Sequence, residues 1–221
     1  RASLRQRLAR WFPDGTTAGV GSAWAGGRPL MRAAGSSASS SRLVREHEVE
    51  QLPSGLISLL GGKWTTCRVL ALDALHLVLE RLGGPEPAAK PLPLLGSAAD
   101  SDQTVPQLQA LRPRLLQQLP DHPQQAAQAE HLIASYGLRA EEVIHHARQP
   151  SELEPLSEVL PICRAEWRFN IAQEWATTSS DLLSRRSRLA LLDQQETARL
   201  SAMASELLVD SGSTSPINHQ Q

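Results

Sequence analysis

Apolar residues recur at helical spacing through most of the second half of the chain. The pattern predicts helices over 106–119, 123–136, 139–147, 156–160, 162–177, 180–192 and 193–208. Tyr136-Gly137 and Gln149-Pro150 separate some of these helices, because glycine and proline interrupt helical backbone. The sequence therefore predicts a compact all-α domain over residues 106–210.

The first half of the chain combines short apolar runs with one long helix. An amphipathic helix is expected over 3–12, and strands are expected over 16–24, 43–51 and 56–60, the last apolar throughout and suited to burial. Helical spacing then runs from Thr65 to Leu82, with Thr65 or Thr66 as the expected cap. The expected buried stripe of this helix consists of Val69, Leu70, Ala74, Leu77, Val78 and Leu82.

The boundary between the two halves is marked by proline and glycine without sustained periodicity, beginning at Gly83-Gly84-Pro85. The predicted fold class is α+β, with a first domain of a few strands plus a helix and a second domain that is all-α. The predicted division is a first domain over 1–84, a linker over 85–105, the helical domain over 106–210 and a disordered tail over 211–221.

Composition narrows the classes of function. The 221 residues include 22 basic and 23 acidic side chains, so bulk charge does not favour a nucleic-acid partner. Two cysteines offer no disulfide framework and fit a reducing compartment; Cys67 is expected to be a packing residue. No apolar run approaches the roughly 20 residues that span a bilayer. Three arginines in the 3–12 helix are interpreted as a solvated face in preference to a lipid or nucleic-acid contact.

The stretch from Gly55 to Arg68 places a glycine pair directly between an apolar strand and a helix start. Gly61 and Gly62 leave room for close approach of backbone, and the helix dipole adds partial positive charge. Lys63 adds a full positive charge. An electron-rich ligand that gains negative charge suits such a site. A plain strand-to-helix turn is the alternative.

Four segments, in order, carry a family resemblance. They are Ser-Ala-Trp-Ala-Gly-Gly-Arg-Pro-Leu at 22–30, Arg-Glu-His-Glu-Val at 45–49, Gly-Gly-Lys-Trp-Thr-Thr-Cys-Arg at 61–68, and a last block from Glu166 to Leu189. The chain resembles the C-terminal part of FAD-dependent glycerol-3-phosphate dehydrogenases and the related alpha-glycerophosphate oxidases. The Gly-x-Gly-x-x-Gly turn that the family carries near its N-terminus does not occur in this sequence, which begins at Arg1. The resemblance therefore implies a piece of a longer enzyme.

In that family the intact enzyme oxidises sn-glycerol 3-phosphate to dihydroxyacetone phosphate, with hydride passing to the flavin and electrons leaving to a quinone or to oxygen. The resemblance implies that Arg28 and Arg45 contact the substrate phosphate. His47 is a candidate proton acceptor, although a hydrogen-bonded structural histidine is the more common reading of such a position. The residues implied to contact FAD are Gly61, Gly62, Lys63, Trp64 through its backbone N–H, and Thr65.

Whether the chain acts as an enzyme by itself is left open by the sequence. Without the pyrophosphate-binding half it is expected to bind FAD poorly, so the expected partner is the N-terminal FAD-binding half. The resemblance implies a cytoplasmic location, and it leaves a homodimer and a peripheral contact with the cytoplasmic membrane open. The alternative is a non-catalytic helical interaction or dimerisation module left from a truncated flavoenzyme.

Charged residues concentrate near the end of the chain. This cluster is interpreted as a structural ion network, with a phosphate or lipid patch as the alternative. Asp181 and Arg185 have the spacing that pairs side chains along a helix. The histidines at 131, 145 and 146 lack a recognisable ligand spacing, so no metal is predicted. The members of the charged cluster are Glu166, Glu174, Asp181, Arg185, Arg186 and Arg188.

Overall fold

The computed structural model describes residues 2–13, 19–27, 47–85 and 92–212. Internal contacts divide the chain into a helical unit, residues 1–24 with 93–221, and a hairpin unit, residues 25–92. Residues 1–24 thus group with the helical unit, whereas the sequence places them before the linker. The domain limits proposed from the sequence, 1–84, 85–105, 106–210 and 211–221, stay a prediction.

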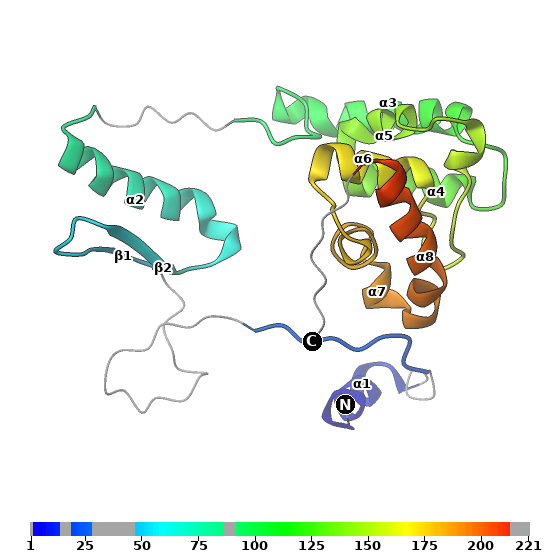
Figure 1. Cartoon of the computed structure of the whole chain (residues 1–221), viewed down its shortest axis with the longest axis horizontal. Coiled ribbons are helices and arrows are strands. Elements are labelled where there is room, and N and C mark those ends of the chain that lie inside the picture. The colour runs from blue at the N-terminus through cyan, green and yellow to red at the C-terminus, as the bar shows by residue number, and fades with distance from the viewer. Residues whose placement is uncertain (1, 14–18, 28–46, 86–91, 213–221) are drawn as a thin grey trace. The chain divides into compact units, whose positions relative to one another are not determined.

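The helical unit contains most of the helices that helical spacing predicts, with limits shifted by a few residues (Figure 1). Its first helix, α1 (Ala2–Trp11), matches the expected amphipathic helix. The main α-helices after the hairpin unit are α3 (Thr104–Gln118), α4 (Gln125–Tyr136), α5 (Ala140–His145), α6 (Arg164–Glu174), α7 (Leu189–Leu192) and α8 (Gln194–Asp210). Short 3-10 turns lie at Ser101–Gln103, Gly137–Arg139 and Pro150–Leu153, and a π-helix spans Asp181–Arg186.

Helix α6 lies between two hydrophobic cores. Ala165 and Phe169 of this helix, with Cys163 just before it, pack with buried side chains of α3, α4 and α5. Ile162 and Trp167 pack instead with the π-helix, α7 and α8. Since residues on both sides of α6 are buried, the helix is central to the helical unit, as Figure 1 shows.

Two segments of the helical unit depart from the predicted pattern. Residues 156–160 are irregular where a helix was expected, because Pro161 disfavours helical backbone at Leu160 and the short segment between Pro155 and Pro161 can form almost no helical hydrogen bonds. The Leu156 N–H donates to the carbonyl of Ile162 at 2.8 Å and closes this loop. The helix expected over 180–192 is divided into the π-helix and α7 by Arg188, whose backbone is left-handed at φ 62° and ψ 15°.

Residues 19–24 form no strand, so the strand expected over 16–24 is wrong for the residues that the structure describes. This segment runs along the loop between α7 and α8. The Gln194 N–H donates to the carbonyl of Gly21 at 3.1 Å, and the Ser22 hydroxyl donates to the carbonyl of Ala190 at 2.6 Å. A Cβ at Gly21 would lie 2.7 Å from the Leu192 carbonyl oxygen, so only glycine permits this approach. Side-chain and loop packing replace a ladder of strand hydrogen bonds.

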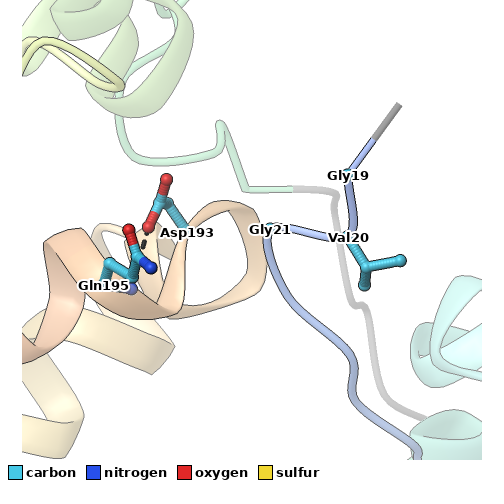
Figure 2. A pocket seen from close by; sticks show the side chains of 5 residues that line it. All are labelled: Gly19, Val20, Gly21, Asp193 and Gln195. Atoms are coloured by element: carbon cyan, nitrogen blue, oxygen red, sulfur yellow. Dashed lines mark hydrogen bonds between the residues drawn. The ribbon is translucent and has the colours of Figure 1, made fainter. Parts of the chain in front are cut away.

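The same segment lines a shallow pocket of about 340 Å³ with α8. Figure 2 shows Gly19, Val20 and Gly21 on one side and Asp193 with Gln195 on the other. The Asp193 carboxylate accepts hydrogen bonds from the N–H groups of Gln195 and Glu196, at 2.8 and 3.0 Å. Asp193 therefore caps α8 and is already committed to the helix.

The hairpin unit consists of one antiparallel strand pair and one helix. Strand β1 (His47–Gln51) pairs with β2 (Ile57–Gly61), and α2 (Cys67–Leu82) follows after a 3-10 turn at Trp64–Thr66. These elements confirm the strand at 56–60 and the 65–82 helix, while the strand expected over 43–51 is described only from His47. The described parts of both units together confirm the α+β class.

Burial in the hairpin unit differs from the prediction. Leu59 and Leu60 are exposed although a buried strand was expected, and Val69 and Leu82 are exposed although the buried stripe of α2 was to include them. Leu70 is buried. Among the described residues α2 packs on a single two-stranded hairpin, so one narrow face of the helix is covered. Cys67 is also exposed, which corrects its expected packing role.

Within the described part of the chain, no helix combines the length and the apolar character that a membrane crossing requires.

Candidate functional site

The glycine pair forms a tight turn between β2 and α2. Gly61 and Gly62 have φ angles of 70° and 84°, in the left-handed region that favours glycine. A Cβ on Gly62 would lie 2.5 Å from Leu70 Cδ2 and 3.2 Å from His47 Cβ. The turn therefore lies directly on the buried leucine of α2, and a larger residue at position 62 would displace it.

The residues between the glycine pair and α2 are exposed, so the N-terminal end of the helix is accessible. Lys63, Trp64 and Thr65 are exposed, and Trp64 is 90% exposed. Thr66 occupies the N-cap position of α2, but its hydroxyl donates back to the Lys63 carbonyl at 3.1 Å and makes no cap. The positive end of the helix dipole and the Lys63 ammonium thus lie on the same exposed turn. This arrangement suits an anionic or electron-rich group.

His47 lies beside this turn. It faces Gly61 in the register of the hairpin, and its Nε2 is 2.6 Å from the Asp73 carboxylate on α2. A carboxylate at this distance fixes the orientation of the ring and selects the tautomer with a proton on Nε2. The contact accords with the structural reading of His47; its role as a proton acceptor stays a proposal. The sequence analysis missed Asp73 because the two residues belong to different elements.

The structure brings together His47, Gly61 and Gly62, and the turn that follows carries Lys63 to Thr65. Arg28 and Arg45, the residues expected at the substrate phosphate, lie outside the described residues.

The helical unit holds a second group of polar residues around a buried carboxylate. Glu166, 1% exposed, accepts from His131 Nε2 at 3.0 Å and from the Tyr136 hydroxyl at 2.8 Å. The Tyr136 hydroxyl also lies 3.0 Å from Asn170 Oδ1. Burial, together with the nearby Glu166 charge, raises the pKa of Tyr136, and burial raises the pKa of Cys163 to about 12. Both groups stay protonated at neutral pH, and neither is poised as a nucleophile.

The charged cluster expected near the end of the chain separates into distinct contacts. Asp181 and Arg185 form the predicted pair at 2.8 Å, and Arg186 lies 3.5 Å from the Glu174 carboxylate. Glu166 belongs to the buried group instead, so its expected membership of one ion network is wrong. Arg188, the left-handed residue between the π-helix and α7, is exposed.

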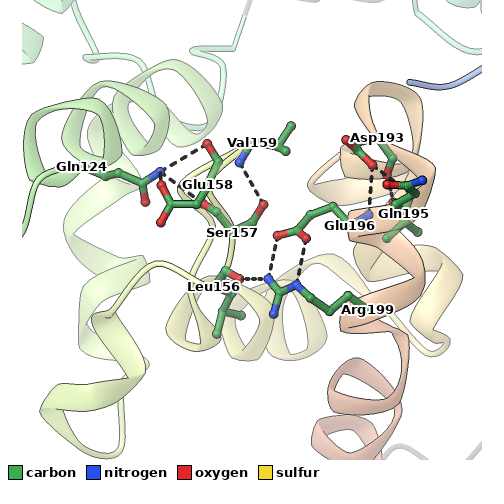
Figure 3. Close-up of polar contacts among 10 residues, drawn as sticks. Gln124, Leu156, Ser157, Glu158, Val159, Asp193, Gln195, Glu196 and Arg199 are labelled. Atoms are coloured by element: carbon green, nitrogen blue, oxygen red, sulfur yellow. Dashed lines mark hydrogen bonds and ion pairs between the residues drawn. The ribbon is translucent and has the colours of Figure 1, made fainter. Parts of the chain in front are cut away.

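A separate polar group ties the irregular 156–160 loop to α8, as Figure 3 shows. Arg199 donates to the Leu156 carbonyl and to both Glu196 carboxylate oxygens. These hydrogen bonds from Arg199 lower the pKa of Glu196 to about 2. These contacts fix the 156–160 loop against α8 although the loop is not helical. None of the residues involved belongs to the glycine turn.

Comparison with known proteins finds one matching family and several relatives. Residues 88–214 match the C-terminal domain of alpha-glycerophosphate oxidase, more than half of the chain. "Glycerol-3-phosphate dehydrogenase 1" of Mycobacterium tuberculosis is 31% identical over 190 residues, covering 84% of this chain and 33% of that protein. The mitochondrial glycerol-3-phosphate dehydrogenase of Homo sapiens is 34% identical over 179 residues, covering 78% of this chain and 23% of its own length.

The probable mitochondrial glycerol-3-phosphate dehydrogenase of Dictyostelium discoideum is 33% identical over 181 residues, covering 78% of this chain and 27% of that protein. The chain thus spans a third or less of the length of these relatives. Because residues 88–214 match its model, the chain belongs to the family of the C-terminal domain of alpha-glycerophosphate oxidase, and it corresponds to the C-terminal part of such proteins.

Proposed function

We propose that this chain is the C-terminal part of an FAD-dependent glycerol-3-phosphate dehydrogenase that oxidises sn-glycerol 3-phosphate to dihydroxyacetone phosphate. The observation that carries the proposal is the exposed turn at Gly61–Thr65, which joins β2 to the N-terminal end of α2. Its two left-handed glycines, the helix start and Lys63 provide a small, positively charged surface. The names of the relatives supply the substrate.

The residues of the turn fit a flavin in their chemistry. FAD, when bound, supplies the hydride acceptor of the reaction. Gly61 and Gly62 present backbone without a Cβ, so a flat ring system can approach closely. The backbone N–H of Trp64 and the side chains of Lys63 and Thr65 would hold the ring. The positive charge of Lys63 and of the helix start stabilises negative charge that develops on a group bound there.

Residues around the turn complete the proposed division of roles. His47 would take the proton of the substrate hydroxyl, oriented through Asp73, and Arg28 and Arg45 would hold the substrate phosphate. A buried position for the reacting hydroxyl would require the N-terminal FAD-binding half as partner. A cytoplasmic location with peripheral membrane contact, a quinone or oxygen acceptor and a homodimer are parts of the same proposal.

The experiment is reconstitution followed by visible absorbance. The chain is purified alone and together with the part of the M. tuberculosis relative that this chain does not cover, FAD is added, and bleaching of the flavin band on addition of glycerol 3-phosphate is recorded. We expect weak flavin binding by the chain alone and substrate-dependent bleaching in the reconstituted pair. Lys63→Met should slow bleaching at least tenfold, while Lys90→Met, the matched control, should not. Bound flavin that glycerol 3-phosphate fails to bleach would refute the proposed activity.

A second candidate is a non-catalytic helical interaction module. It is favoured by the helical unit, which closes two hydrophobic cores from its own residues. If residues 93–221 alone form a stable dimer and the reconstituted pair stays inactive, this second function is supported over the first.

A further inference from the structure

A shallow pocket of about 280 Å³ lies on the helical unit, apart from the glycine turn in sequence and in the contacts that form it. Ser135 and Tyr136, at the end of α4, form one part of it. The remaining lining comes from the end of α6, the π-helix and the residue that follows: Glu174, Arg185, Arg186 and Arg188. Three arginines from one short segment thus surround a hollow large enough for a phosphate group.

Two of these three arginines form ion pairs within the helical unit. Arg185 is paired with Asp181 at 2.8 Å, and Arg186 is held by the Glu174 carboxylate at 3.5 Å and by the Glu174 carbonyl. Within the described residues no ion pair holds Arg188, and its side chain is exposed. Asp181 and Glu174 are paired with Arg185 and Arg186, and Glu166 is hydrogen-bonded by His131 and Tyr136, so among the described contacts Arg188 is the pocket cation that no carboxylate neutralises. A purely structural ion network explains Arg185 and Arg186 and leaves Arg188 without a role.

The backbone that carries these arginines is irregular. The π-helix over Asp181–Arg186 widens one turn, and such turns recur at functional sites. Arg188 adopts φ 62°, which is unfavourable for a residue with a Cβ. Strained backbone of this kind clusters at catalytic and ligand-binding sites. Asparagine or glycine would occupy this conformation at lower cost. The presence of arginine at a left-handed position therefore points to use of its guanidinium.

The part of the pocket formed by α4 is anchored by buried hydrogen bonds and offers the Ser135 hydroxyl as a donor. The Tyr136 hydroxyl is committed to Glu166 and Asn170 in the buried group, and this contact anchors the end of α4. Ser135, the residue before it, is exposed and lines the pocket. A hydroxyl donor facing planar guanidinium donors matches the tetrahedral oxygens of a phosphate.

We propose that this pocket is a phosphate-binding site, in which Arg186 and Arg188 donate hydrogen bonds to the phosphate oxygens and the Ser135 hydroxyl donates a third. The phosphate can be free in solution or can be the headgroup of an anionic lipid. Every residue that lines the pocket belongs to the helical unit, so the proposal uses no residue of the glycine turn.

The test is a titration of the full chain with inorganic phosphate at constant ionic strength, followed by isothermal calorimetry, with no FAD or glycerol 3-phosphate present. The decisive variant is Arg188→Asn, because asparagine tolerates the left-handed backbone and the fold is kept. We expect saturable binding by the wild-type chain, weakened at least tenfold in Arg188→Asn with no loss of thermal stability. Arg112→Gln, an exposed arginine of α3 paired with Glu130, is the matched control and should bind as the wild type does.

Vesicles separate the two sources of phosphate. Cosedimentation is measured with phosphatidylcholine vesicles and with vesicles that also contain phosphatidic acid. Binding of inorganic phosphate without Arg188-dependent vesicle binding assigns a soluble ligand, whereas Arg188-dependent binding to the acidic vesicles assigns a lipid headgroup. If neither probe binds, or if Arg188→Asn binds both probes as tightly as the wild type, the proposal is overturned and the pocket is a surface for protein carboxylates or for solvent.

Discussion

Replacing Arg168 by methionine would leave a buried carboxylate without its cation. The side chains of Glu152 and Arg168 are only 4% and 10% exposed. Arg168 Nε lies 3.1 and 2.9 Å from the two Glu152 carboxylate oxygens, and Nη2 lies 2.8 Å from Oε1. Arg168 Nη1 also reaches Asp210, at the end of α8, at 3.0 Å. One guanidinium thus joins α6 to a 3-10 turn and to α8.

The expected loss is large because the charge of Glu152 stays buried. After the change, the N–H of Arg148, at 2.9 Å, is the remaining donor to this carboxylate among the described contacts. Breaking a buried ion pair by removing one partner costs about 3–5 kcal/mol. We therefore expect Arg168→Met to lower the free energy of unfolding at pH 7 by about 3 kcal/mol or more. The double variant with Glu152→Gln should recover part of the loss, because its amide carries no charge.

Urea unfolding followed by circular dichroism measures the change. The matched control is Arg112→Met, which breaks an exposed pair with side chains 45% and 57% exposed. Exposed pairs contribute about 0–1 kcal/mol, so the control should lose no more than that. Equal losses in Arg168→Met and Arg112→Met would refute the reasoning, as would a double variant less stable than Arg168→Met by itself.

The same pair gives a pH dependence of known sign. Hydrogen bonds from Arg168 hold the pKa of Glu152 below its ordinary value of 4.5. Because the folded pKa lies below the unfolded one, the contribution is complete above about pH 4.5 and is lost as the pH falls through the folded pKa. The stability difference between the wild type and Glu152→Gln should therefore be largest near neutral pH and should narrow on acidification.

Three further changes test other parts of the structure. Gly62→Ala and Gly83→Ala both place a Cβ at positive φ, which costs about 1–2 kcal/mol, but Gly83 faces open space while Gly62 meets Leu70. Overpacking adds about 1–3 kcal/mol, so Gly62→Ala should speed amide hydrogen exchange in β1 and β2 more than Gly83→Ala does; equal exchange would contradict the packing described for the turn. Asp193→Ala removes the cap of α8 and should lower the free energy of unfolding by about 1 kcal/mol, seen as a lower melting temperature, and an unchanged melting temperature would count against the cap. A thiol-specific disulfide reagent should label one cysteine, Cys67, in the native chain and two in urea, because the Cys163 thiol is buried and its pKa is raised to about 12; rapid labelling of both in the native chain would disprove its burial.

The sequence predicts the helices of the helical unit well because their apolar residues repeat at helical spacing around shared cores. It fails at residues 156–160, where apolar spacing is present but the segment between Pro155 and Pro161 is too short to form more than about one helical turn. It also fails at Arg188, since no local pattern of residue types signals a left-handed arginine. The order of short motifs identifies the family, whereas a structure is needed to see how the helical unit is closed.

For the candidate site, the sequence predicts the turn and misses its surroundings. Gly61 and Gly62 are recognisable because strand, glycine pair and helix follow one another directly. Asp73 is not recognisable as the partner of His47, because 26 residues separate them and the contact depends on how α2 lies on the hairpin. The exposure of Leu59 cannot be predicted from the sequence either, because an apolar residue in a strand has the same pattern whether or not another element covers it.

The position of α6 between two cores bears on how the helical unit folds. Phe169 completes the core with α3 to α5, and Trp167 completes the core with α8, although only two positions separate them in the chain. Neither core can close until this one helix has formed, and once it has formed both can close. We therefore expect the two cores to unfold together, so that a destabilising change at Phe169 also speeds amide hydrogen exchange in α8.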